Sequence, residues 1–376
     1  MQQFLCLPLA GGSTIRSFFF GVRALQRGRA LNTRLNTRWM CTGVVIFWTI
    51  VIGLWAWPTA SYAAESLVVY SGRAERLIKP VLDVFEDKTG ITIQLLTSGS
   101  TELVNRLRIE GPNTPADVFI TNDAGTLERA RELRLLRPIS MKEVERNIPP
   151  AFRAPDNSWI GLSGRIWVVV ANTQRVQSHE ISSILDVADP RWKGQLAIPN
   201  AVSEYLQAGV SVILALKGEA VAKKFLEGIK ANAGNQVYSK NRQIVDAVAK
   251  GKVALGLVNH YYIYRHLAKH PQAPITPILT DQEEGGMGMI MNVAGVGVTA
   301  HAKHVDAAKR LVQFLVSQAG QRLFASLNKE YPLHPEVEAD PALPPRDSFH
   351  VAQVPLTRLS ELRDPTMRLI EQVGLR

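Results

Sequence analysis

The chain has 376 residues and a formal net charge of +10, with 43 Lys and Arg against 33 Asp and Glu. Six of the positive charges are arginines in the first 63 residues, so residues 64–376 hold 37 basic and 33 acidic side chains. This near balance, without a basic tract, argues against nucleic acid and anionic membrane as partners. Both cysteines, Cys6 and Cys41, also lie before residue 64, which excludes disulfides, zinc-thiolate sites and a cysteine nucleophile from the rest of the chain.

Residues 1–63 have the pattern of a signal peptide. A segment with arginine as its only charged residue precedes an apolar stretch at 43–57, and the small residues Ser61 and Ala63 occupy the −3 and −1 positions of a cleavage site. A transmembrane anchor is the alternative, although the stretch is shorter than the ~20 residues that a membrane span needs. The long basic segment also suggests that translation begins at Met40. The pattern therefore predicts export to the periplasm.

The first part of the remaining chain alternates between strands and helices. Short β-branched runs at 66–70, 91–96 and 117–121 each precede a helical pattern, at 74–88, 101–110 and 125–135. This alternation predicts an α/β sheet. The next strand, at 165–171, is nearly all apolar, and a Gly- and Ala-containing strand follows much later at 290–298. The 313 residues after the signal peptide are more than a single hydrophobic core usually holds, which predicts two lobes. We interpret these two strands as the crossings between the lobes.

The later part of the chain contains more helices. The pattern predicts helices at 183–187, 204–217, 219–231, 241–250, 305–318, 320–327 and 356–373, a turn at 189–194, and strands at 195–199 and 253–259. The last of these strands runs into the pair Tyr261-Tyr262. In open α/β sheets ligands bind beyond the carboxyl ends of strands, so the pair lies where a ligand is expected.

The adjacent tyrosines suggest a hard metal ion as the ligand. Phenolate oxygens are anionic donors that suit Fe(III). Taken alone, such a pair is more often a strand or helix end with one ring buried and one solvated. The chain has no Gly-x-Ser-x-Gly elbow, and its Gly285-Gly286-Met287-Gly288 run completes no nucleotide-binding fingerprint, so we expect no enzymatic activity.

Eight separated motifs occur in one order along the chain. They are Val69-Tyr70-Ser71-Gly72-Arg73, Pro115-Ala116-Asp117-Val118-Phe119, Asp123-Ala124-Gly125, Gly161-Leu162-Ser163, Asp189-Pro190-Arg191-Trp192-Lys193-Gly194, Lys240-Asn241, Asn259-His260-Tyr261-Tyr262 and Glu330-Tyr331-Pro332-Leu333. In this order the chain resembles the periplasmic ferric-ion-binding proteins of ABC importers, from about residue 66 to the C-terminus. The tyrosine pair is the motif most diagnostic of the ligand, and the others mark mainly the scaffold.

The resemblance implies a two-lobe α/β fold of the type II periplasmic binding protein class, with two strand crossovers between the lobes. The lobes would comprise 64–165 plus 292–342 and 166–291 plus 343–376. It also implies a monomer that binds a ferric ion or small ferric chelate between the lobes and delivers it to an ABC permease. Tyr261 and Tyr262 would be iron ligands. Tyr205 is the candidate for a third, the alternative being a tyrosine packed in the first turn of a helix.

Departures from the family pattern refine the expected site. Ala74 stands where many members have a histidine ligand, and Asn122 stands where some have a glutamate ligand. The resemblance therefore implies a site made mainly of tyrosines and completed by carbonate or water. Arg73 and Arg165 are candidates to hold this anion, because a guanidinium matches a planar oxyanion, with an ordinary ion pair as the alternative for each.

Three further residues border this expected site. Asn241 and Asn259 match positions that hydrogen-bond the anion in some relatives. His260, beside the tyrosine pair, is expected to support the site or the hinge more than to bind the metal. Two other functions stay open, because related binding proteins hold other anions: binding of a phosphorylated or other anionic small molecule, and presentation of a ligand to a periplasmic sensor.

Overall fold

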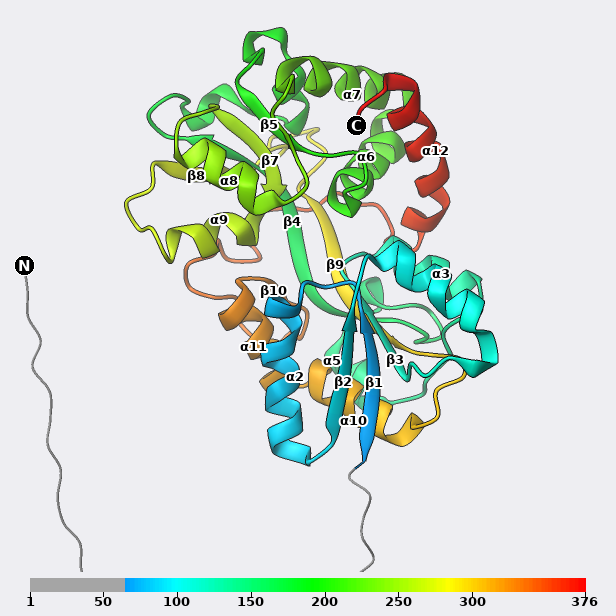
Figure 1. The fold of residues 1–376 in the computed structure, drawn as a ribbon. Coiled ribbons are helices and arrows are strands. Elements are labelled where there is room, and N and C mark those ends of the chain that lie inside the picture. The colour runs from blue at the N-terminus through cyan, green and yellow to red at the C-terminus, as the bar shows by residue number, and fades with distance from the viewer. Residues whose placement is uncertain (1–64) are drawn as a thin grey trace, which may run out of the picture. The chain divides into compact units, whose positions relative to one another are not determined.

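Two long antiparallel strands connect the two lobes of the molecule. The structure, a computed structural model, describes residues 65–376, and the predicted signal peptide lies outside them. Strand β4 (Ile160–Asn172) and strand β9 (Ile290–Val298) run through the middle of the molecule (Figure 1). They pair from Ile160 with Val296 to Trp167 with Ile290. Every residue of both strands is buried.

The first lobe, drawn below the crossing in Figure 1, is built on three parallel strands. Its elements are β1 (Ser66–Ser71), β2 (Thr92–Thr97), β3 (Val118–Thr121), α2 (Glu75–Thr89), α3 (Ser100–Glu110), α4 (Ala124–Glu132), α5 (Lys142–Asn147), α10 (Val305–Val316), α11 (Gln318–Asn328) and β10 (Tyr331–Pro332). Helix α2 shows why these segments fold as they do. Leu77, Val81 and Phe85 repeat at helical spacing and are buried, and Gly90 ends the helix in the left-handed conformation that glycine adopts without strain.

The second lobe lies above the crossing in Figure 1 and repeats the pattern of strand followed by helix. Its elements are β5 (Leu196–Pro199), β6 (Val237–Tyr238), β7 (Leu255–Asn259), β8 (Ile275–Ile278), α6 (Glu204–Lys217), α7 (Glu219–Ala233), α8 (Asn241–Ala249), α9 (His260–Leu267) and α12 (Arg358–Val373). The strands of both lobes join in one sheet, in the order β2-β1-β3-β9-β4-β7-β5-β6, with β8 and β10 also paired to β4. The predicted α/β class with two strand crossovers is confirmed.

Several element boundaries differ from the sequence prediction. Strand β4 begins at Ile160, five residues before the predicted start. The prediction missed residues 160–164 because they contain two glycines and lack a strand-like pattern. Backbone contact requires one of them, since a Cβ on Gly161 would lie 2.7 Å from the Phe152 carbonyl oxygen. Helices α5 and α9 and strand β8 were not predicted. The predicted helix at 183–187 is a 3-10 helix at Ile184–Ala188.

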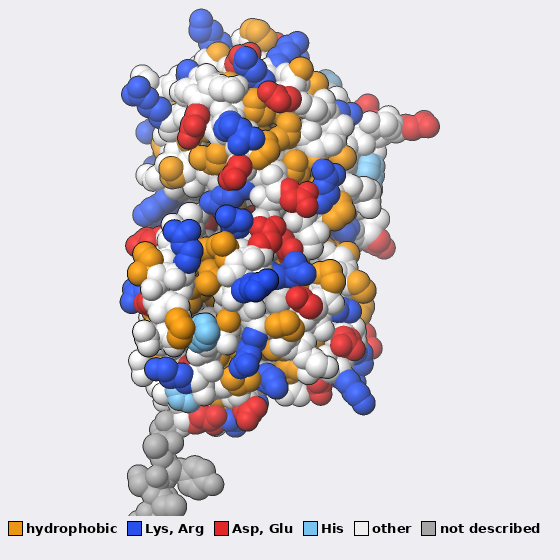
Figure 2. Space-filling view, turned by 90° about the vertical axis from the view of Figure 1, so that its right-hand side faces the viewer, with side chains coloured by type: hydrophobic (Ala, Val, Ile, Leu, Met, Phe, Trp, Pro, Cys, Tyr) orange, Lys and Arg blue, Asp and Glu red, His pale blue; other side chains and the backbone are white. Residues whose placement is uncertain are grey.

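Charged side chains of both signs are interspersed on the face that contains α12 and α3 (Figure 2). Over residues 65–376 no helix is both long and apolar enough to cross a bilayer. The lobe boundaries at 165 and 342 stay a prediction.

Candidate metal centre

The cleft between the lobes is bordered by the first turns of several helices. In the first lobe α2, α3 and α4 follow β1, β2 and β3, and in the second lobe α6, α8 and α9 follow β5, β6 and β7. Helices that follow the carboxyl ends of parallel strands begin at the same edge of the sheet. Helix N-termini present unpaired backbone N–H groups and a partial positive charge, which favours anionic groups. The fold therefore builds an environment suited to anions before any side chain is considered.

A polar cavity of about 750 Å³ lies in this cleft. Its lining residues include Gly72, Arg73, Ala74, Arg76, Ser98, Gly99, Ser100, Asn122, Asn200, Ser203, Glu204, Tyr205, Ser239, Lys240, Asn241, Arg242 and Tyr262. A cavity of about 880 Å³ lies elsewhere, beside β10 and the segment after it. It contains none of the predicted site residues, so we place the functional site in the interlobe cavity.

The three predicted tyrosines come together at this cleft. Tyr261 and Tyr262 lie in the first turn of α9, and their rings are tilted by 30° with centroids 4.4 Å apart. Tyr205 lies in the first turn of α6, and its hydroxyl is 3.4 Å from the Tyr261 hydroxyl. Tyr261 is buried, whereas Tyr205 and Tyr262 are partly exposed and line the cavity. The predicted strand end at Asn259 is confirmed, and the structure places the pair just after it, in the first turn of a helix.

Burial controls the acid–base behaviour of these phenols. It raises the pKa of Tyr205 well above the usual value of a phenol, and the neighbouring Tyr262 adds to this shift. Burial likewise raises the pKa of Tyr261, with a further contribution from Tyr205. Both phenols are therefore protonated at neutral pH in the protein alone. Only a strongly charged cation would stabilise the phenolate form here.

Arg165 is buried on β4 beside the tyrosines. The central carbon of its guanidinium lies 5.2 Å from the centroid of the Tyr205 ring. Its Nη1 and Nη2 are buried and find no acceptor among residues 65–376. Buried guanidinium donors without a partner carry a desolvation cost, which an anionic ligand would offset. The predicted role of Arg165 in holding an anion is consistent with this geometry.

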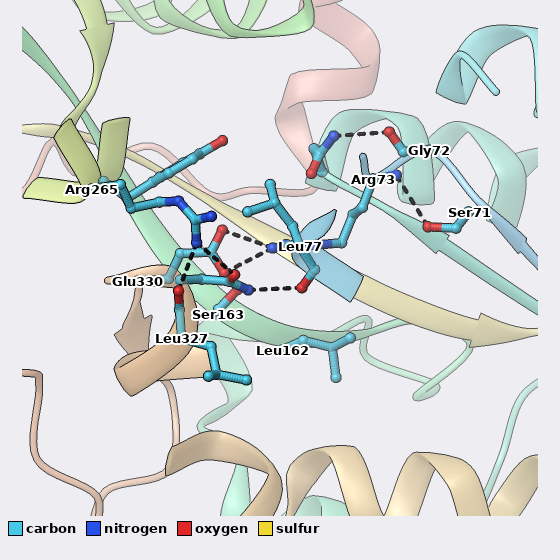
Figure 3. A network of polar contacts seen from close by, with 12 residues as sticks. Ser71, Gly72, Arg73, Leu77, Leu162, Ser163, Arg265, Leu327 and Glu330 are labelled. Atoms are coloured by element: carbon cyan, nitrogen blue, oxygen red, sulfur yellow. Dashed lines mark hydrogen bonds and ion pairs between the residues drawn. The ribbon is translucent and has the colours of Figure 1, made fainter. Parts of the chain in front are cut away.

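Arg73 is buried in an ion pair, the alternative that the sequence left open for it. Its Nη2 donates to both carboxylate oxygens of Glu330, at 2.8 and 2.9 Å, and Ser163 Oγ donates to the same carboxylate at 2.7 Å (Figure 3). Nε and Nη1 of Arg73 stay buried without an acceptor in the described part of the chain. Arg73 therefore fits both predictions made for it. It forms an ion pair, and it also keeps free donors at the cavity wall that could hold an anion.

The two predicted asparagines contact one another, and Asn241 lines the cavity. Asn241 begins α8, and its Oδ1 accepts a hydrogen bond of 3.1 Å from the backbone N–H of Asn259. The Nδ2 of Asn259 is buried and finds no acceptor in residues 65–376. Asn241 thus fixes the end of β7, and Asn259 retains a donor that a bound anion could use.

His260 supports the site from behind. The ring is buried, and its Nδ1 accepts a hydrogen bond of 3.2 Å from the backbone N–H of Ile166 on β4. It also packs on the Tyr331 ring, with centroids 4.9 Å apart. Burial lowers the pKa of His260 to about 3, so the ring is neutral near pH 7. These contacts connect the start of α9 to both β4 and β10.

The two departures from the family pattern also lie at the cavity. Ala74 precedes α2 and contributes no donor atom, and Asn122 uses its Nδ2 to donate to the Gly72 carbonyl oxygen at 3.0 Å. Across residues 65–376, no group of three or more His, Cys, Asp or Glu is placed to hold a metal ion. A metal in this cleft would therefore depend on phenolate oxygens.

Two carboxylates beside the site were not predicted from the sequence. Glu204 precedes Tyr205 in the wall of the cavity, and burial together with the nearby Asp123 raises its pKa to about 7. In the sequence it resembles any acidic residue in a first helical turn. Glu330 belongs to a motif that marked only the scaffold. Its pairing with Arg73 spans 257 positions, so no local pattern could predict it.

Comparisons with known proteins show the family of the chain. The family model described as bacterial extracellular solute-binding protein matches residues 67–326. The chain is 30% identical over 326 residues to the major ferric iron-binding protein of Neisseria meningitidis, covering 85% of this chain and 96% of the relative. It is 29% identical over 316 residues to iron uptake protein A1 of Synechocystis, covering 82% of this chain and 87% of the relative.

Solved structures agree as well. A Trichodesmium protein in complex with iron and citrate ligands is 30% identical, with a TM-score of 0.73. The alignment covers 83% of this chain and all of that chain.

The buried, neutral His260 predicts acid sensitivity of the ligand-free protein. Because the ring has a pKa of about 3 in the folded state and about 6.5 when unfolded, the unfolded state binds the extra proton between these values. The free energy of unfolding should fall below pH 6.5, with His260 contributing at most about 1.4 kcal/mol per pH unit. In His260→Asn, whose amide oxygen can accept from Ile166, the decline from pH 6.5 to 4 should be shallower. Equal slopes in urea titrations of both proteins would contradict this explanation.

Proposed function

Because the chain belongs to the bacterial extracellular solute-binding protein family, we propose that it is the periplasmic component of an ABC importer and captures Fe(III) between its lobes. Tyr205, Tyr261 and Tyr262 supply the metal-binding phenolates. The supporting observation is the convergence of three phenols from two helices, with the hydroxyls of Tyr205 and Tyr261 3.4 Å apart in a cleft bordered by buried cations. The ferric and iron-uptake names of the relatives agree with this ligand.

The charges of the site suit a trivalent ion. Three phenolates neutralise the charge of Fe(III) and occupy three positions of an octahedral ion, which leaves the others to an external anion or water. Carbonate is the anion that we propose, because its planar oxygens match guanidinium donors. The free donors of Arg165 and Arg73, with Asn259 Nδ2, would bind it, and Asn241 would hold Asn259 in place.

Transport follows from the two-lobe architecture. The lobes close around the ferric ion or a small ferric chelate, the complex docks on a permease in the inner membrane, and opening of the lobes releases the iron. We propose a monomer, and no chemical step is required. The importer is favoured over a sensor because the relatives include an iron uptake protein.

The first test is the colour of the iron-loaded protein. Phenolate bound to Fe(III) gives a charge-transfer band in the visible range, so loading with ferric citrate should turn the protein red to orange. Tyr261→Phe or Tyr262→Phe should abolish the band, and Tyr205→Phe should weaken or shift it. Tyr264→Phe, on the same α9 helix but not among the proposed ligands, is the matched control and should leave the spectrum unchanged.

A colourless wild-type protein would overturn the ferric assignment. If such a protein instead bound a phosphorylated metabolite in calorimetry, the alternative of an anion-binding protein would replace it. This alternative is supported by three cationic residues in the cavity wall, Arg76, Lys240 and Arg242, which would attract an anionic ligand.

The second test counts protons. Because burial raises the pKa of Tyr205 and Tyr261, iron must displace protons from phenols that are fully protonated. The association constant should therefore fall as the pH falls, by about tenfold per pH unit for each displaced proton. We expect the wild type to release one more proton per iron than Tyr205→Phe does, measured by competition with a ferric chelator of known affinity. Equal proton counts would remove Tyr205 from the ligand set.

The third test addresses the anion. Adding bicarbonate should tighten iron binding to the wild type, and Arg165→Gln should lose about tenfold of affinity through the lost charged hydrogen bonds. The control is Arg322→Gln, which changes an exposed residue on α11 that does not line the cavity. Full bicarbonate dependence in Arg165→Gln would show that another group holds the anion.

A further inference from the structure

The C-terminal helix α12 contacts both lobes beside the cleft. Its C-terminal half is attached to the second lobe, where Thr366 Oγ1 lies 2.8 Å from Ser211 Oγ on α6 and Lys230 Nζ on α7 donates to the Val373 carbonyl oxygen at 2.7 Å. In Figure 1 the helix runs from this lobe down to the level of α3. Its N-terminal half therefore meets elements of the first lobe.

Three residues of this N-terminal half contact the first lobe. Leu359 packs on α4, where a Cβ added to Gly125 would lie 3.0 Å from the Leu359 Cβ. Ser360 Oγ donates to Glu132 Oε2 at 3.0 Å. Arg363 makes the most specific contact, since its Nη2 donates to Thr101 Oγ1 at 2.6 Å and its Nη1 donates to Thr126 Oγ1 at 3.3 Å.

The two threonines connect Arg363 to the walls of the site. Thr101 lies in the first turn of α3, directly after cavity residues Ser98, Gly99 and Ser100. Thr126 lies in the first turn of α4, and its hydroxyl donates to Asp123 Oδ2 at 2.8 Å. The other oxygen of Asp123 accepts from Asn292 on the crossing strand β9, at 2.7 Å. A continuous chain of hydrogen bonds thus leads from α12 to the strand that joins the lobes.

The charge of Arg363 is balanced locally. A cation beside helix N-termini is unfavourable, and Arg363 lies beside two of them. The carboxylate of Asp123 offsets this charge from the first lobe, and the carboxyl of Glu204, whose pKa is influenced by both Asp123 and Arg363, lies nearby on the second lobe. Arg363 is therefore hydrogen-bonded to one lobe and carried by a helix of the other, with one acidic group of each lobe near it.

We propose that Arg363 is a positioning residue that clamps the lobes together at the side of the cleft and slows the release of the bound ligand. The proposal rests on the proposed capture of a ligand between the lobes. Opening moves the first turns of α3 and α4 away from α12, so both hydrogen bonds of Arg363 must break. Hydrogen bonds to charged groups are stronger than neutral ones, and their loss should accelerate opening by about tenfold.

The test measures release of iron from the full-length mature protein into an excess of a competing chelator. In Arg363→Gln the charge-transfer band should keep its position but decay about tenfold faster than in the wild type. Arg363→Lys, which keeps the charge and one donor group, should show an intermediate rate. Thr101→Val removes an acceptor from the opposite lobe and should also accelerate release.

The matched control is Arg358→Gln on the same helix, because Arg358 is exposed and pairs with Glu361 of α12 itself. Its release rate should equal that of the wild type. A wild-type rate in both Arg363→Gln and Thr101→Val, or equal acceleration in Arg358→Gln, would overturn the clamp. Melting curves show whether Arg363→Gln is folded. If it is not, the release rates of Arg363→Lys and Thr101→Val test the clamp.

Small-angle scattering separates this proposal from the ferric assignment. The ligand-free Arg363→Gln protein should have a larger radius of gyration than the ligand-free wild type, because its lobes separate more often. If the wild type gave no charge-transfer band, the ferric assignment would fail and the scattering comparison would decide the clamp. Equal radii of gyration for the ligand-free wild type and Arg363→Gln would then overturn the clamp.

Discussion

β4 and β9 lie at the centre of the sheet, and their antiparallel pairing sets the position of almost every group in the cleft. The register places Arg165 opposite Asn292 and pairs Trp167 with both Ile290 and Asn259. A shift of one residue would exchange the two faces of the strand and remove Arg165 from the tyrosines. Because both strands are buried over their full length, such a shift would also disrupt side-chain packing on both faces of the sheet. One set of backbone hydrogen bonds thus joins the lobes and aligns the site.

The site itself is built from groups that are unfavourable without a ligand. Burial of Arg73 is compensated in part by Glu330 and Ser163, yet two of its donor atoms and two of Arg165 stay without acceptors in residues 65–376. Buried phenols beside these cations resist ionisation until a metal supplies its charge. The protein stores this electrostatic cost in the ligand-free state, and a phenolate-bound ferric ion with its anion would relieve it. The same reasoning explains why a site without three His, Asp or Glu side chains can still suit a trivalent metal.

Local pattern predicted most of the regular elements. Helices such as α2, α6 and α12 and strands such as β1, β2 and β5 agree with the prediction within a few residues, because their apolar periodicity is long and regular. Helix α9 was missed because it has only eight residues, of which three tyrosines and two histidines have low helix propensity. The start of β4 was missed because its two glycines carry no strand signal, although Gly161 is needed for close backbone approach.

The sequence alone determined the α/β class and, through its family motifs, the ferric assignment, because the order of residue types can be read without the fold. It also named three tyrosines as candidate ligands, which stays a prediction. Only the tertiary structure decided that Tyr205 and Tyr261 meet, that Arg73 pairs with Glu330, that Glu204 shares the cavity wall, and that α12 reaches both lobes. These contacts join residues from 56 to 262 positions apart. Periodicity and spacing describe neighbours along the chain, whereas such contacts depend on the register of the sheet and the packing of helices from different lobes.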